Sequence, residues 1–265
     1  MTSSWPNGRS ATVAVTVDLD AETMWTSKDA ANARRPVVMS QAKYEIDFGV
    51  DYFLEAFADL GIAATFFVPG WVAERNPSLV RKIAASGHEI ASHGYDHTRI
   101  SAHPPEFEKW TITRSKHILE ELTGERVLGY RAPYFELTEQ TLDLLRDLEM
   151  SYSSNLMNSV HPYRHPDSGI VELPVSWMWD DGPYYLFATE PPNYRQMFPP
   201  AVVRDAWYAE FQALAELGGL MNLVLHPQLS ARPSRLVALK SLLEQMKSEG
   251  AWLAPCREVA DTVPA

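Results

Sequence analysis

Short apolar runs rich in β-branched and aromatic residues alternate along this chain with longer stretches of helical periodicity. This alternation is typical of parallel strands joined by crossover helices. We therefore predict one α/β domain over residues 1–265, a distorted (β/α) barrel of about seven or eight parallel strands. The predicted strands are Thr12–Val17, Ala64–Val68, Glu89–Ser92, Val127–Tyr130, Val171–Leu173, Met221–Leu225 and Trp252–Ala254.

Helical periodicity is clearest in four segments between these strands. The first begins at Asp47, which we predict as an N-cap, and ends before Gly61, a residue suited to the position just past a helix. The other three lie within residues 78–87, 138–150 and 202–217.

Two long segments, Ala21–Ile46 and Trp177–Pro200, show neither a strand pattern nor helical periodicity. Loops of this length inside a compact domain are usually functional or disordered. The second segment is so rich in aromatic residues that we predict a lid or pocket wall instead of disorder. Its aromatic residues are Trp177, Trp179, Tyr184, Tyr185, Phe187, Tyr194 and Phe198.

Charge and composition narrow the ligand and the compartment. Asp and Glu number 34 against 23 Lys and Arg, a formal charge of −11, which disfavours nucleic acid and favours a neutral or cationic small molecule. No stretch approaches the roughly 18 apolar residues of a membrane span. The apolar run Ala14–Val17 is too short for a signal peptide. With the single cysteine Cys256, these features predict a cytoplasmic protein, either monomeric or a homo-oligomer.

Ionisable residues follow four of the predicted strands at their carboxyl ends. In a parallel β/α fold these ends share one rim, where catalytic groups gather. His93 and His97 are four residues apart, which would place both imidazoles on one side of a helical turn. With a carboxylate from the first strand they would hold one metal ion and leave a coordination position open for water, as catalytic Zn²⁺ requires. The residues on this rim are Asp18, Asp20, His93, His97, Arg131 and His226.

The two aspartates are two positions apart and would point to the same side of a strand. One could bind the metal while the other accepts a proton from water, kept ionised by Arg131. His226 could act as a general acid or be a hydrogen-bonded structural residue. His88, at the opposite end of its strand, is assigned to structure. Taken singly, each of these residues also has an ordinary structural explanation, such as a turn, a cap or a surface ion pair.

Four segments in order, TVDLDAE, HGYDH, RAPY and LVLH, resemble the motifs of the polysaccharide deacetylase family, also called carbohydrate esterase family four. The usual motifs read T-F-D-D-G, H-[ST]-x-x-H and R-x-P-[YF], followed by a histidine after an apolar strand. Here Leu19 separates the two aspartates, and Gly94 replaces Ser or Thr. The family's fourth motif, commonly D-x-x-D-W, has only WMWDD at 177–181 as a loose counterpart.

The resemblance implies a role for each motif residue. Asp18 would be the catalytic base, Arg131 would orient it, and His226 would be the acid. The main-chain N–H of Tyr134 would help to stabilise the oxyanion. The cofactor would be a divalent metal, Zn²⁺ first, with Co²⁺, Mn²⁺ or Ni²⁺ as alternatives. The metal ligands would be Asp20, His93 and His97.

The implied reaction is hydrolysis of an amide or imide carbon–nitrogen bond other than a peptide bond. The D-x-D spacing, the Glu-Leu-Pro at 172–174 and HPQLSARP at 226–233 resemble a subgroup with cytosolic peptidoglycan-deacetylase-like proteins, cyclic imide hydrolases and allantoinase-like enzymes. A small cyclic imide or ureide is our first substrate hypothesis, because the aromatic segment could enclose a compact ring. The predicted substrate-binding residues are Glu172, Trp177, Trp179 and Tyr185.

Three alternative functions stay open. The same groups could remove an N-acetyl group from a peptidoglycan- or chitin-type amino sugar, with the aromatic side chains stacked on sugar faces. A sugar-binding protein without catalysis would be expected to have broken motifs, whereas every ligand, acid and base position here is filled. A set of two histidines and one carboxylate also suits a non-haem iron oxygenase, but those enzymes usually have a β-sandwich, which the β/α alternation opposes.

Overall fold

The computed structural model describes residues 5–9, 11–189, 192–193 and 196–264. Its central strands are β1 (Thr12–Asp18), β2 (Thr65–Val68), β3 (Glu89–Ser92), β4 (Gly129–Tyr130), β5 (Tyr152–Ser153), β6 (Tyr163–Arg164), β7 (Val171–Glu172), β10 (Leu220–Leu225) and β11 (Trp252–Ala254). They form one sheet in the order β10-β1-β2-β3-β4-β5-β7-β6, with β11 also paired to β1. The ladders are parallel apart from that between β6 and β7, so a mostly parallel sheet is confirmed.

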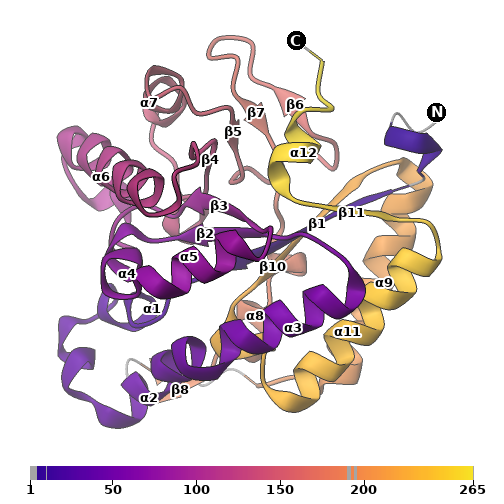
Figure 1. Cartoon of the computed structure of the whole chain (residues 1–265), viewed down its shortest axis with the longest axis horizontal. Coiled ribbons are helices and arrows are strands. Elements are labelled where there is room, and N and C mark those ends of the chain that lie inside the picture. The colour runs from indigo at the N-terminus through magenta and orange to yellow at the C-terminus, as the bar shows by residue number, and fades with distance from the viewer. Residues whose placement is uncertain (1–4, 10, 190–191, 194–195, 265) are drawn as a thin grey trace.

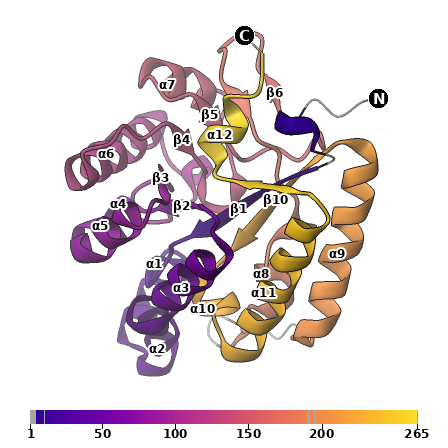
Figure 2. The ribbon, with the colours of Figure 1, turned by 45° about the vertical axis from the view of Figure 1, so that its right-hand side comes forward.

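Helices cover the outer side of the curled sheet (Figures 1 and 2). They are α1 (Thr23–Thr26), α2 (Pro36–Tyr44), α3 (Val50–Leu60), α4 (Gly70–Arg75), α5 (Pro77–Ala85), α6 (Pro105–Thr123), α7 (Thr141–Asp147), α8 (Gly182–Tyr185), α9 (Pro200–Leu217), α10 (Pro227–Ser230), α11 (Pro233–Ser248) and α12 (Cys256–Ala260). Helix α11 packs between α3 and α9. Within the described part of the chain, none of the helices has both the length and the apolar character that crossing a membrane demands.

Strand β1 pairs with β2, β10 and β11, and its seven residues are all buried. Burial on both faces is expected for a parallel strand covered by helices. The register aligns Val17 with Leu225 of β10, and Asp18 with Phe67 of β2. Farther along, Ser92 of β3 lies opposite Tyr130 of β4. The carboxyl ends of these strands therefore share one rim, as the sequence predicts.

The barrel is distorted where β7 faces β10, because no ladder joins these two strands in the described structure. The chain after β7 closes this gap instead. Asp180 forms an isolated parallel bridge with Val224. The side-chain amide of Asn222 donates to the carbonyl oxygen of Leu173 at 3.1 Å. The predicted distorted (β/α) barrel is confirmed, with polar groups completing its wall.

Local predictions have mixed outcomes. The seven predicted strands are present, with ends that differ by up to two residues. Gly61 ends α3 in the left-handed region, with φ of 60°. The prediction of Asp47 as an N-cap is wrong, because α2 continues through the π-helical segment η3 (Glu45–Gly49) into α3. Asp47 instead accepts a hydrogen bond from Lys43 at 2.7 Å.

The segment Ala21–Ile46 is not the irregular loop that its lack of periodicity indicates. It contains α1, the 3-10 helix η2 (Ala30–Arg34) and α2. These helices are too short for a repeating apolar face to appear in the sequence.

His88 lies buried at the end of the barrel opposite the rim. Its Nδ1 accepts a hydrogen bond from the main-chain N–H of Ala64 at 3.1 Å. The ring packs between Phe57 and Phe66. Burial lowers the pKa of His88 to about 4. The structure therefore agrees with a structural role for this histidine.

We predict that His88 makes the fold less stable in acid. The folded pKa lies below the ordinary value of 6.5, so the unfolded chain binds a proton that folded His88 rejects as the pH falls through this window. His88→Gln keeps an acceptor for Ala64 but cannot titrate. Between about pH 7 and pH 5 its free energy of unfolding should fall by about 2 kcal/mol less than that of the parent. Urea unfolding at both pH values measures the difference, and equal losses would contradict the prediction.

Candidate active site

The ionisable residues predicted at the rim come together in the structure. Asp18 ends β1, His93 follows β3, Arg131 follows β4, and His226 follows β10. Asp20 lies in the turn after Asp18. All of these side chains are buried, and the parallel register described above brings them to one place.

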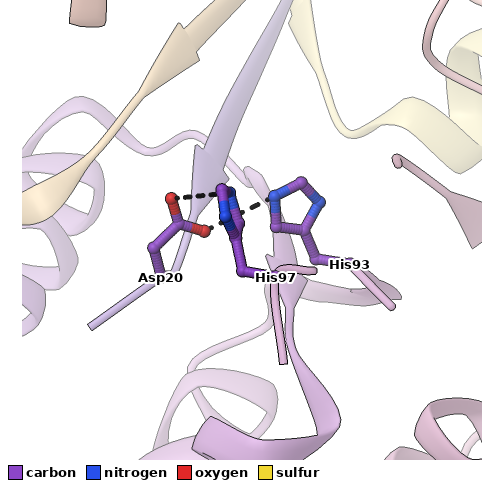
Figure 3. Close-up of side chains that lie close together, drawn as sticks. All are labelled: Asp20, His93 and His97. Atoms are coloured by element: carbon purple, nitrogen blue, oxygen red, sulfur yellow. Dashed lines mark ion pairs between the residues drawn. The ribbon is translucent and has the colours of Figure 1, made fainter. Parts of the chain in front are cut away.

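Asp20, His93 and His97 form a compact group (Figure 3). The Asp20 carboxylate lies 3.4 Å from Nε2 of His93 through Oδ1, and 3.3 Å from Nε2 of His97 through Oδ2. Nδ1 of His93 lies 2.8 Å from the carbonyl oxygen of Arg131, so Nδ1 carries the proton and Nε2 presents its lone pair. Burial lowers the pKa of His97 to about 4, which keeps this imidazole neutral.

The donor atoms of this group fit a divalent cation. Oδ1 of Asp20 is buried and has no hydrogen-bond partner among the described residues. A buried carboxylate oxygen without a partner is costly, and neighbouring imidazole lone pairs would add repulsion. A cation among the three side chains removes both costs. Two imidazole nitrogens and one carboxylate are also a common donor set of catalytic metal sites.

The backbone that presents the two histidines differs from the predicted helical turn. Residues 93–97 form a loop, in which Gly94 has φ of 67° and His97 has φ of 61°. A positive φ at a histidine is strained, and such strain is common at functional sites. The rings are nevertheless adjacent, with centroids 5.1 Å apart.

Arg131 lies fully buried beside Asp18. Its guanidinium donates to Oδ1 of Asp18 at 2.7 Å. Burial by itself raises the pKa of Asp18, but the charge and hydrogen bond of Arg131, with the charge of His226, hold it below its ordinary value. Asp18 is therefore ionised at neutral pH. The other donors of the guanidinium bind Thr16, Ser154 and Asn222.

His226 is paired with Asp181, a residue absent from the predicted site. Nδ1 of His226 lies 2.6 Å from Oδ1 of Asp181. The other oxygen of Asp181 accepts hydrogen bonds from the main-chain N–H of His226 and from the hydroxyl of Ser230. Burial lowers the pKa of His226, but the charge and hydrogen bond of Asp181, with Asp180 and Asp20, raise it well above its ordinary value. Nε2 lies 3.6 Å from Oδ2 of Asp20, so it faces the group formed by Asp20, His93 and His97. The loose motif WMWDD contains Asp181 and was the one sequence signal that could have found it.

A pocket of about 660 Å³ opens over these groups. Aromatic and aliphatic side chains form most of its wall, with Trp177 packed edge-on against Phe135. Its lining residues are Asp18, Asp20, Met24, Trp25, Lys28, His93, His97, Ala132, Tyr134, Phe135, Trp177, Asp180, Gly182, Pro183, Leu186, Ala188 and His226.

Three of the four residues predicted to bind substrate lie outside this pocket. Trp177 lines it, but Trp179 is buried and donates from Nε1 to Glu210 at 3.1 Å. Tyr185 is buried beneath the guanidinium of Arg235. Glu172 is buried in β7, where one oxygen accepts hydrogen bonds from two main-chain N–H groups. The predicted pocket wall therefore needs correction at these three positions, because their side chains belong to the core.

A second carboxylate network, which the sequence analysis missed, joins the loops that carry Asp20 and His226. The main-chain N–H of Ala21 donates to Glu45 at 2.8 Å, and the side-chain amide of Gln228 donates to the other oxygen at 2.8 Å. Gln228 in turn accepts from Nε1 of Trp25, a pocket residue. Glu45 is thus placed to fix the positions of both loops and of the Trp25 side of the pocket relative to one another.

Comparisons with known proteins show the family of this chain. The family model for polysaccharide deacetylase matches residues 46–153. A crystal structure from Mycobacterium smegmatis, described provisionally as a polysaccharide deacetylase, is 38% identical, with a TM-score of 0.93 over 97% of this chain and 91% of that one. The chain belongs to the polysaccharide deacetylase family, a class of hydrolases that act on carbon–nitrogen bonds other than peptide bonds.

Two further proteins are similar over most of the chain. The peptidoglycan deacetylase of Helicobacter pylori is 27% identical, over 94% of each chain. The crystal structure of PuuE allantoinase is 22% identical, with a TM-score of 0.84 over 97% of this chain and 91% of that one. At this level of identity the second likeness shows a shared fold.

We predict that substitutions distinguish the expected metal ligands, Asp20 and His97, from the expected base, Asp18. Asp20→Asn or His97→Ala should lower bound zinc after dialysis against Zn²⁺, because each removes a ligand atom. Asp18→Asn should keep the zinc yet lower hydrolysis by about 10²–10⁴-fold, the usual contribution of a general base. Elemental analysis and initial rates on the same samples distinguish the two effects. Loss of zinc in Asp18→Asn, with zinc retained in Asp20→Asn, would reverse the assignment.

Proposed function

We propose that this protein is a divalent-metal-dependent hydrolase that opens a small cyclic imide or ureide. The observation that carries the proposal is the convergence of three groups beneath one largely apolar pocket. These groups are Asp20 with His93 and His97, Asp18 with Arg131, and His226 with Asp181. The pocket volume of about 660 Å³ falls within the range of sites that enclose small molecules.

A divalent cation held by Asp20, His93 and His97, with Zn²⁺ as the first candidate and Co²⁺, Mn²⁺ or Ni²⁺ as alternatives, would supply Lewis-acid chemistry, acidifying water and stabilising negative charge on the carbonyl oxygen. The protein supplies the remaining steps. Asp18, kept ionised by Arg131, takes a proton from water as the water oxygen bonds to the carbonyl carbon.

Protonation of the leaving nitrogen completes the reaction. His226 gives its Nε2 proton to the nitrogen as the carbon–nitrogen bond breaks, and Asp181 stabilises the charged imidazole before this transfer. The main-chain N–H of Tyr134 donates to the carbonyl oxygen while that oxygen carries charge. Water is thereby added across the bond, and return of the proton from Asp18 to His226 through solvent restores the starting state.

The walls of the pocket support a compact ring as the substrate. Trp25, Phe135 and Trp177 present aromatic surfaces around the catalytic groups, and flat rings pack well against such surfaces. Met24 and Leu186 add apolar contacts. The carbonyl of a ring enclosed here would be shielded from bulk water on most sides.

A second candidate is N-deacetylation of an amino sugar, because the aligned Helicobacter pylori relative is a peptidoglycan deacetylase. Removal of an acetyl group passes through the same kind of tetrahedral intermediate and needs the same acid and base. Trp177 is 48% exposed, which leaves its face free to stack on a sugar. The two candidates therefore differ in the substrate and share the chemistry.

A hydrolysis panel tests the proposal. Zinc-loaded protein is incubated with succinimide, glutarimide, hydantoin, allantoin and chitooligosaccharides, and ring opening or acetate release is followed. We expect turnover of at least one cyclic imide or ureide, and none in Asp18→Asn. Turnover of the chitooligosaccharides alone would establish the second candidate, and activity that persists after complete metal removal would contradict both.

Substitution of two exposed tryptophans tests whether the pocket wall contacts the substrate, with one of them as the control. Trp177 and Trp110 are each 48% exposed, but only Trp177 lines the pocket. Trp177→Ala should lower kcat/KM for the true substrate. The loss should correspond to about 1–3 kcal/mol of transition-state binding free energy, the scale of a lost apolar contact. Trp110→Ala, on α6, should leave kcat/KM unchanged. Equal effects would show that the wall does not contact substrate.

A further inference from the structure

The pocket contains one charged side chain that the proposed reaction does not use. Lys28 follows α1, eight positions after Asp20 in the sequence. Among the described residues that line the pocket, it is the sole Lys or Arg. Its ammonium lies 5.6 Å from the centre of the Trp25 ring, so Lys28 and Trp25 share one part of the wall.

The carboxylates of the pocket already face cationic or metal-binding groups. Asp18 forms an ion pair with Arg131, and an oxygen of Asp180 lies 4.0 Å from Nδ1 of His226. Asp20 faces both histidines of the proposed metal site. These carboxylates are therefore not available as close partners for Lys28.

Lys28 itself has no carboxylate oxygen within 4 Å in the described structure. The side chain of Lys28 is exposed, and it lines the pocket. A molecule bound in the pocket would displace water from its ammonium, which is unfavourable unless that molecule supplies a counter-ion. An anionic group on the bound molecule would compensate for this loss of hydration.

We propose that Lys28 recognises a carboxylate on the substrate, at a position away from the bond that is hydrolysed. The inference rests on the proposed function and narrows its substrate class to cyclic imides or ureides that carry a carboxylate. The net charge of −11 favours neutral or cationic ligands for the surface as a whole. Lys28 provides a local positive charge where the substrate would lie.

A pair of substrates with the same ring tests this inference. Dihydroorotate and dihydrouracil have the same six-membered ring and differ in one carboxylate. The zinc-loaded protein should have a higher kcat/KM for dihydroorotate. Lys28→Gln should lower the ratio of the two kcat/KM values by about tenfold, the effect of one lost charge-assisted hydrogen bond.

Lys43→Gln is the matched control, because Lys43 lies exposed on α2 and pairs with Asp47 outside the pocket. It should leave both kcat/KM values unchanged. The inference is overturned if the parent shows no preference for dihydroorotate, or if Lys28→Gln lowers both values by the same factor.

Binding separates failure of this inference from failure of the proposed function. If neither ring is opened, the proposed function fails for this ring, and titration calorimetry on the full chain without metal still tests Lys28. Metal-free protein is used so that the carboxylate cannot bind the cation. Dihydroorotate should bind about tenfold more tightly than dihydrouracil, and Lys28→Gln should remove the difference. The absence of any preference in the parent would overturn the inference.

Discussion

The buried ion pair between Arg131 and Asp18 is the interaction on which the rest of the site depends. A guanidinium inside a barrel is tolerated only when its donors are satisfied. Here Asp18, Thr16, Ser154 and Asn222 accept its hydrogen bonds. Asn222 also donates to Leu173 across the gap between β7 and β10. One network therefore keeps the proposed base ionised and completes the barrel wall.

Residues near His226 also combine a structural contact with a proposed catalytic one. Asp181 holds the ring and the main-chain N–H of His226, while the neighbouring Asp180 bridges to Val224 and lines the pocket. The segment that closes the barrel is therefore also the one that sets the charge of the proposed acid. Barrel closure and acid catalysis are coupled through adjacent residues, so a change in this segment should affect both.

The sequence was sufficient to predict seven strands of the sheet and the rim, because β-branched runs and strand-end polar residues are local signals. It missed the two-residue strands β5 and β6. It could not show that Trp177 lines the pocket while Trp179 is buried in the core. The two tryptophans are only two positions apart in a short 3-10 helix (Trp177–Trp179), and they face different ways. Helix α6 was missed because polar residues such as Thr111 and Ser115 occupy its buried face. Glu45 was missed because its partners, Ala21 and Gln228, are 24 and 183 residues away. Such contacts depend on the tertiary fold.

In the proposed mechanism, Asp20, His93 and His97 hold the catalytic cation. Anomalous diffraction at the zinc absorption edge, from crystals grown with Zn²⁺, tests this assignment most directly because it locates the ion itself. We expect one anomalous peak, which marks the zinc ion, at about 2.0–2.2 Å from the ligand nitrogen and oxygen atoms of these three side chains. A peak at the second group of potential ligands, Asp180, Asp181 and His226, with none at the first, would contradict it.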